Sequence, residues 1–319
     1  MLNFFYIAKN TFRESLREPI FFILLVSALV LIGHFPSMSL FVFREQIKLV
    51  VDSAMATTLV FGLFAAVLCA SHTVSREMRN GTALLLLSKP VYRSSFILAK
   101  IAGIIAALVV FVFICNAATL TAIVIAKDQF NMNMVAYYLF FSVIAGSAVF
   151  GLICNYMQGK SFASNSIMAM LVSIPLLTLI LTLTNQHVDV PFGTLIPALL
   201  LLFMAVATMG TITVAIASRL DMVANLSICT VIFFLGLISS YLFNHQFDSQ
   251  FINFINRGLY AILPNWQFFW LADALASQQQ IPASYVIWTL LYTLLYMLLC
   301  SIWAIVMFQN LELAKDGTN

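Results

Sequence analysis

Charged residues are scarce in this sequence. Aspartate, glutamate, lysine and arginine together make up 8% of the 319 residues, whereas 62% of the residues are hydrophobic. Soluble domains usually contain about a quarter charged residues, so this composition excludes a soluble protein and indicates an integral membrane protein. The net charge of +3 is not concentrated in a solvated basic domain that would neutralise phosphates, and we therefore expect no nucleic-acid partner.

Motifs for hydrolysis and metal binding are missing as well. The sequence contains neither H-E-x-x-H nor G-x-S-x-G, the motifs of zinc proteases and serine hydrolases. Its cysteines form no Cys-x-x-Cys pair and fall within or at the ends of apolar runs, which is typical of small buried hydrophobic residues. They are Cys69, Cys115, Cys154, Cys229 and Cys300. We expect no catalytic residue, no disulfide and no metal site.

A nucleotide site is also not expected in this chain. The nearest match to a phosphate-binding loop is CNYMQGKS, residues 154–161. Cys154 replaces the first glycine, and the segment follows an apolar helix where the motif requires a strand and a glycine-rich turn. Ionisable residues near the middle of the bilayer are lacking too: His34 and His72 lie at span ends, and Lys100 is expected to snorkel to the inner surface. A pump of this composition must receive its energy from another protein.

The sequence does contain long apolar runs. A helix needs roughly 20 apolar residues to cross about 30 Å of hydrocarbon, and these runs do not alternate polar and apolar residues as a membrane barrel would. The runs cover residues 19–36, 53–72, 96–126, 135–157, 166–184, 195–216, 223–244 and 285–308. The predicted fold class is all-α: a polytopic helical membrane protein with about eight transmembrane helices in a single domain, residues 19–319.

The basic residues predict the orientation of these spans. In the eight-span arrangement, eleven of the 15 lysines and arginines fall on one side and four on the other. Because basic residues are retained in the cytoplasm, we expect both termini inside and a multi-pass protein of the plasma (cytoplasmic) membrane. Residues 1–18 place Lys9, Arg13 and Arg17 on one helical face; we interpret this segment as an amphipathic interfacial helix, not as a cleavable signal peptide.

Two segments between the spans carry structure of their own. Residues 73–100 hold a third of the basic residues, and Gly81, Thr82 and Pro90 there are suited to end one helix, cap the next and stop it. This short amphipathic element predicts a docking site for a partner outside the membrane. Residues 245–282 are polar and aromatic, with side chains that favour the membrane interface: Tyr260, Trp266, Phe268, Phe269 and Trp270. We interpret them as helices lying in the outer leaflet.

A family resemblance rests on the first of these segments. Glu77, Gly81-Thr82, Leu86-Leu87, Pro90-Val91, Arg93, Phe96 and Lys100 match an E-x-x-x-G-T, L-L, P-V-x-R-x-x-F-x-x-x-K run that resembles permeases of the ATP-binding-cassette (ABC) type 2 exporter family. The amino-terminal helix is similar to the family's elbow helix, and Leu263 to Trp266 resemble the segment before its last span. The family commonly has six spans, so the two near residues 135–184 resemble an added hairpin.

The resemblance implies a permease that forms a homodimer or heterodimer and binds a separate cytoplasmic ABC ATPase. ATP and Mg would be bound by that partner, with no cofactor in this chain. Residues 82–89 would form the coupling helix within a coupling segment, residues 73–95. The implied partner-binding residues are Arg76, Glu77, Gly81, Thr82, Leu84, Leu85, Leu86, Leu87, Pro90 and Arg93, and a second contact would involve Arg219 and Asp221.

The expected function is therefore that of the membrane-spanning subunit of an ABC exporter, itself not an enzyme. Two alternatives remain open. A non-transporting scaffold or assembly factor would use the same docking segment without moving a substrate. A membrane-embedded enzyme would need polar residues that converge within the spans. The sequence does not identify the substrate.

Overall fold

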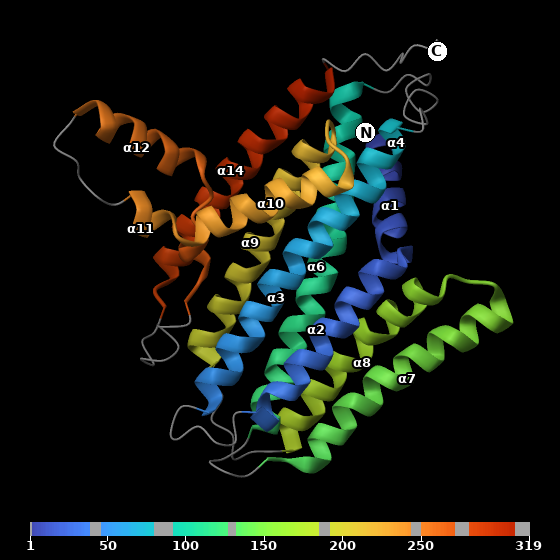
Figure 1. Cartoon of the computed structure of the whole chain (residues 1–319). Coiled ribbons are helices and arrows are strands. Elements are labelled where there is room, and N and C mark those ends of the chain that lie inside the picture. The colour runs from blue at the N-terminus through green and yellow to red at the C-terminus, as the bar shows by residue number, and fades with distance from the viewer. Residues whose placement is uncertain are drawn as a thin grey trace.

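The structure is a computed structural model that describes residues 2–38, 46–79, 92–126, 132–184, 192–243, 250–271 and 281–309. Within these ranges every regular element is a helix (Figure 1). Seven helices are long and apolar enough to cross a membrane, which confirms the predicted all-α, multi-pass architecture. They are α2 (Pro19–Met38), α3 (Gln46–Ala70), α6 (Arg93–Ile125), α7 (Met134–Gln158), α8 (Phe162–Thr184), α9 (Phe192–Ala217) and α14 (Ala283–Gln309).

The eighth predicted span has a different form. Residues 222–243 form α10 (Met222–Leu237) and, after a break at Ile238, the short helix α11 (Ser239–Phe243). A helix of 16 residues is about 24 Å long, less than the roughly 30 Å of a bilayer core. Figure 1 shows α10 crossing the bundle at a steep angle to α3 and α9, with α11 and α12 (Gln250–Ile262) to one side.

Helix α6 is the centre of the bundle. It packs against α1 (Leu2–Arg17), α2, α3, α8, α9 and α14, and its buried residues lie on all sides of the helix. A helix that is apolar all round is expected at such a position. Phe111 shows the packing: its ring meets the ring of Phe21 edge to face with 5.6 Å between centroids.

Helix α1 packs along the first half of α6. Thr11, Ser15 and Leu16 are its buried residues, and Gly103 of α6 lies directly against the Ala8 carbonyl and the Thr11 side chain. Phe5 is exposed, whereas Ile7 and Phe12 are partly buried against the core. Small hydroxyl residues and apolar residues therefore share the contact face of α1. Its location on the membrane surface stays a prediction.

Helices α7 and α8 form a tight hairpin at the position of the predicted added pair of spans, and both are long and apolar enough to cross a membrane. Gly159 ends α7 in the left-handed conformation, with φ of 63°, where a side chain is disfavoured. The Asn155 amide then donates to the Lys160 carbonyl across the turn, at 2.6 Å. The Gly-Lys-Ser sequence thus closes a helical hairpin after a long helix, which agrees with the interpretation that it is not a phosphate-binding loop.

Candidate functional site

The candidate residues that the structure describes gather at one end of the bundle. Helix α3 continues through a π-helical turn, η2 (Ser71–Ser75), into α4 (Arg76–Arg79), which contains Arg76 and Glu77. Arg93 begins α6, and Arg219 and Asp221 lie in the turn between α9 and α10. We call this end, where α1, α4, the start of α6 and the end of α14 lie together, the polar end (Figure 1).

The central part of the predicted coupling segment lies outside the described residues. This applies to Gly81, Thr82, Leu84, Leu85, Leu86, Leu87 and Pro90. The predicted helix over residues 82–89 therefore stays a prediction. The two ends of the segment, α4 and the first turn of α6, are described, and they are joined by contacts to the rest of the bundle.

Lys100 makes the strongest of these contacts. Its ammonium group lies 2.8 Å from Glu77 Oε1 and 3.7 Å from Glu14 Oε2, and it donates a hydrogen bond to the Thr73 carbonyl at 3.3 Å. The side chain is only 2% exposed, so the expectation that Lys100 snorkels to the surface was wrong. It is buried among three elements, α1, η2–α4 and α6, and is paired there with carboxylates, as a buried charge requires.

Glu14 is the second acid of this cluster. Burial raises the pKa of its carboxyl above 4.5; nearby Lys100 acts in the opposite direction, while Glu77 and Glu18 add to the increase. Two carboxylates around one ammonium group leave one negative charge in excess, which acts in the same direction as burial on the pKa of Glu14. Glu14 was not among the predicted site residues, because nothing in the sequence of α1 shows that it meets a lysine 86 positions later.

The π-helical turn η2 connects the polar end to four helices. Ser71 accepts a hydrogen bond from the Asn225 amide of α10 at 3.1 Å, and Ser75 donates to the Ala217 carbonyl at the end of α9, at 2.9 Å, and to Leu220. His72 lies 3.3 Å from Glu18, just after α1, and the Thr73 carbonyl accepts from Lys100 of α6. One turn of helix is thus bonded to groups in or beside α1, α6, α9 and α10.

The two residues of the predicted second contact also have structural roles. The Arg219 Nε donates to the Met307 carbonyl at the end of α14, at 3.1 Å, and the Asp221 carboxylate accepts from the Ala224 amide, at 3.2 Å, as the N-cap of α10. An aspartate at this position satisfies an amide that would otherwise lack a partner. Both side chains are exposed.

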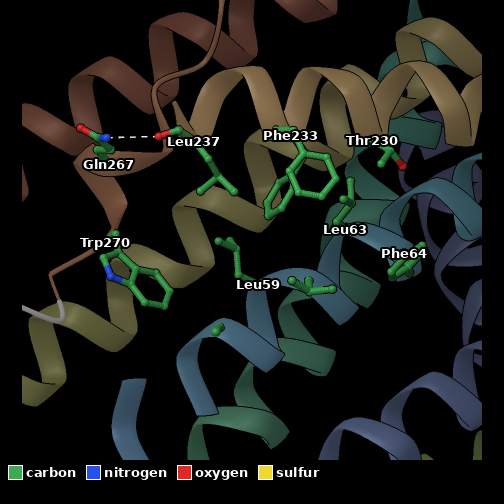
Figure 2. A pocket seen from close by; sticks show the side chains of 11 residues that line it. Leu59, Leu63, Phe64, Thr230, Phe233, Leu237, Gln267 and Trp270 are labelled. Carbon is green, nitrogen blue, oxygen red and sulfur yellow. Dashed lines mark hydrogen bonds between the residues drawn. The ribbon is translucent and has the colours of Figure 1, made fainter. Parts of the chain in front are cut away.

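A cavity of about 730 Å³ lies between α3, α10 and η3 (Trp266–Phe269). Its walls are mainly leucine and phenylalanine side chains, with Thr230 towards one side and Gln267 and Trp270 towards the other (Figure 2). None of the residues around it is ionisable; they are Ala56, Leu59, Val60, Leu63, Phe64, Thr230, Phe233, Phe234, Leu237, Gln267 and Trp270. A cavity of this size is in the range that holds a small organic ligand.

Residues 265–270, which precede the last span, form one wall of this cavity. Asn265 is buried and donates to Ser240 Oγ and to the Tyr260 hydroxyl, both at 2.9 Å, and Gln267 donates to the Leu237 carbonyl at 3.1 Å. The indole of Trp266 packs directly against Gly236, where no side chain would fit. Trp266 and Phe269 are each 1% exposed, so these two side chains contact other protein groups; the location of residues 245–282 in the outer leaflet stays a prediction.

In the part of the chain that the structure describes, no group of three or more His, Cys, Asp or Glu side chains is arranged to hold a metal ion. At the polar end, the Lys100 ammonium group and the hydroxyl groups of Ser71 and Ser75 form hydrogen bonds with groups of other elements. These contacts hold the helices at this end of the bundle together.

Comparison with known protein families identifies the family of this chain. The model of the ABC-2 family transporter protein matches residues 5–186, more than half of the chain. The matched region contains nearly all of α1, the whole coupling segment and the α7–α8 hairpin. Comparisons with curated proteins and with solved structures gave no match. The chain therefore belongs to the ABC-2 family of transporter membrane proteins.

Proposed function

We propose that this chain is the permease subunit of an ABC exporter in the plasma (cytoplasmic) membrane, driven by ATP hydrolysis in a separate subunit. Membrane components of the family are typically non-catalytic and associate with an ABC ATPase. The observation that carries the proposal is the match of the family over the whole coupling segment, whose two described ends are fixed to the bundle through Lys100.

In this proposal the ATPase docks on the coupling helix, residues 82–89, which follows α4 in the sequence. Arg76 and Arg93 flank that docking site, and Arg219 and Asp221 contribute a second, smaller contact. ATP and Mg bind to the ATPase, and two permease chains, identical or different, assemble with two ATPase subunits. Closure of the ATPase pair moves the coupling segments and, through them, the helices around the substrate.

The apolar cavity between α3 and α10 favours a transporter over a scaffold. A scaffold requires a docking surface but no internal space for a ligand, whereas a substrate needs a site within the membrane-spanning helices. The side chains around the cavity carry no charge, which suits an uncharged or apolar part of a substrate. We place the substrate there during transport.

Substitutions in the coupling segment test the docking of the ATPase. A fully buried leucine contributes about 1.5–3 kcal/mol, and an aspartate in its place adds an unpaired charge to an apolar contact. Leu85→Asp and Leu86→Asp should therefore lose most of the bound ATPase in a pull-down from detergent-solubilised membranes, while the permease is still inserted. Lys127→Ala, on the opposite side of the predicted topology, is the control and should retain it.

The scaffold alternative is distinguished by substrate movement. In proteoliposomes that contain permease and ATPase, an exporter should show ATP-dependent transport of at least one compound that also stimulates ATP hydrolysis. Normal recovery of the ATPase by both aspartate variants would exclude residues 82–89 as the docking site.

A further inference from the structure

Lys100 and the turn η2 are two features that membrane insertion does not require. Replacing a buried ion pair by apolar residues is often neutral or stabilising, and π-helical turns are rare and occur frequently at functional sites. Here the two are in contact, because the Lys100 ammonium group bonds both the Thr73 carbonyl within η2 and the Glu77 carboxylate just after it. Their association at the entrance to the coupling segment indicates a shared role.

The π-helical form determines where Glu77 lies. In η2 the Arg76 amide donates to the Ser71 carbonyl, five residues earlier, instead of to the carbonyl four residues earlier as in an α-helix. If the turn became α-helical, the residues after it would rotate by about 100° and shift by about 1.5 Å relative to α3. That rotation would carry the Glu77 carboxylate away from Lys100.

Glu14 keeps the Lys100 ammonium group paired if Glu77 moves away. Its carboxylate lies 3.7 Å from the Lys100 ammonium group, farther than Glu77 but close enough to remain paired with it. The lysine therefore has a partner on α1 when Glu77 on α4 has left. Two arrangements of the cluster are then accessible, one with Glu77 on Lys100 and one with Glu14 alone.

The same turn bonds to the helix that forms the cavity wall. Ser71 of η2 is bonded to Asn225 in α10, and Ser75 is bonded to the end of α9 and to Leu220, just before α10. Thr230, Phe233, Phe234 and Leu237, farther along α10, line the cavity. A change in η2 is thus passed by direct hydrogen bonds to a helix that would contact the substrate.

We propose that Lys100 is a positioning residue that holds η2 in its π-helical form, and that η2 passes movement of the coupling segment to α10. When the docked ATPase draws α4 away from Lys100, the turn changes to an α-helix and α10 moves with it. This inference rests on the proposed function, because it requires an ATPase that docks on residues 82–89.

The first test uses the purified full-length permease alone in lipid nanodiscs. Lys100→Met removes the charge, Lys100→Arg keeps it, and Lys160→Met is the matched control in the exposed α7–α8 turn. Hydrogen exchange of the backbone amides of residues 71–79 should be at least about tenfold faster in Lys100→Met than in wild type, since a lost charged hydrogen bond weakens local structure by about that factor. Lys100→Arg and Lys160→Met should exchange like wild type. Unchanged exchange in Lys100→Met overturns the inference.

The second test separates positioning from simple structural support, in the complex of permease and ATPase. A cysteine at Val231, an exposed position on α10, is reacted with a maleimide with and without ATP and vanadate, after Cys154→Ser. The reaction rate should change with ATP in wild type, Lys100→Arg and Lys160→Met. It should not change in Lys100→Met, although the ATPase still copurifies. An ATP-dependent change that persists in Lys100→Met refutes the role of Lys100.

A further variant covers the case in which Lys100→Met does not fold. Glu77→Gln leaves Lys100 paired with Glu14, and it should show the same faster exchange in residues 71–79 and a reduced ATP response at position 231. Wild-type behaviour of Glu77→Gln in both measurements overturns the inference. If the ATPase fails to bind even the wild-type chain, the proposed function itself fails, which the pull-down reveals independently of the exchange measurement.

Discussion

Replacing Gly103 with alanine should loosen α1 from the bundle. A Cβ atom at this position would lie 2.5 Å from the Ala8 carbonyl oxygen and 2.7 Å from the Thr11 Cβ. The first of these atoms belongs to the backbone of α1, so the clash is relieved only by moving the helix. Glu14 would then move away from Lys100 together with α1.

The change in stability caused by Gly103→Ala is the sum of two opposing contributions. Alanine in place of glycine favours a helix by up to about 1 kcal/mol, whereas overpacking of a close contact costs about 1–3 kcal/mol. Gly146 in α7 is a matched control, because a Cβ atom there would meet nothing within 4 Å. The gain in helix propensity is common to both variants, so their difference in stability measures the clash, about 1–3 kcal/mol.

Tryptic cleavage of α1 measures this difference. Arg13 and Arg17 are exposed cleavage sites on α1, and cleavage requires the helix to leave α6 and unfold locally. Cleavage in Gly103→Ala should be faster than in Gly146→Ala by roughly tenfold for each 1.4 kcal/mol. Equal rates in the two variants would show that α1 is not held against α6 at Gly103.

Three further outcomes are expected. Because the pKa of Glu14 is raised in the folded chain, the folded state binds this proton more tightly than the unfolded state, and the stability it adds is full below pH 4.5 and lost as the pH rises through the folded pKa. Glu14→Gln should therefore be at least as stable as wild type at neutral pH in thermal unfolding, and a larger loss at neutral pH than near pH 5 would contradict this sign. Val60→Trp fills the apolar cavity from α3 and should reduce substrate-stimulated ATP hydrolysis, whereas Val306→Trp on α14, outside the cavity, should not; equal effects would argue against a substrate in the cavity. In intact cells, a single cysteine at position 130 should react with an impermeant maleimide and one at position 80 should not, and the reverse pattern would invert the predicted topology.

Hydropathy alone was sufficient to predict most of the fold. Seven predicted apolar runs correspond to seven long helices whose bounds differ from the prediction by a few residues, because the bilayer sets a minimum length for any helix that crosses it. The exception is residues 222–243, where α10 ends at Leu237 and Ser239 donates its hydroxyl hydrogen to the Gly236 carbonyl. The mean hydropathy of the run is high enough for a span, and the Gly236 and Ser239-Ser240 positions at the break are too few to lower it.

The candidate site was less predictable. The role of Arg76, Glu77 and Arg93 in binding a partner stays a prediction, and the contact that holds Glu77 comes from Lys100, which Glu14 also approaches. Sequence spacing predicts which residues share a helix face; it does not predict which residues of different helices meet. The position of Lys100 near the predicted membrane surface indicates a side chain that reaches that surface. Its actual partners come from two other parts of the chain.

The π-helical turn has a consequence for related sequences. Such a turn differs from an α-helix by one inserted residue, so a relative that lacks one residue between positions 70 and 76 would have an uninterrupted helix there, with the helices on either side still in register. Elsewhere in α3 the same deletion would turn one half of the span by about 100° against its neighbours. Alignments of this family should therefore tolerate a one-residue gap at η2 and at few other places in this span.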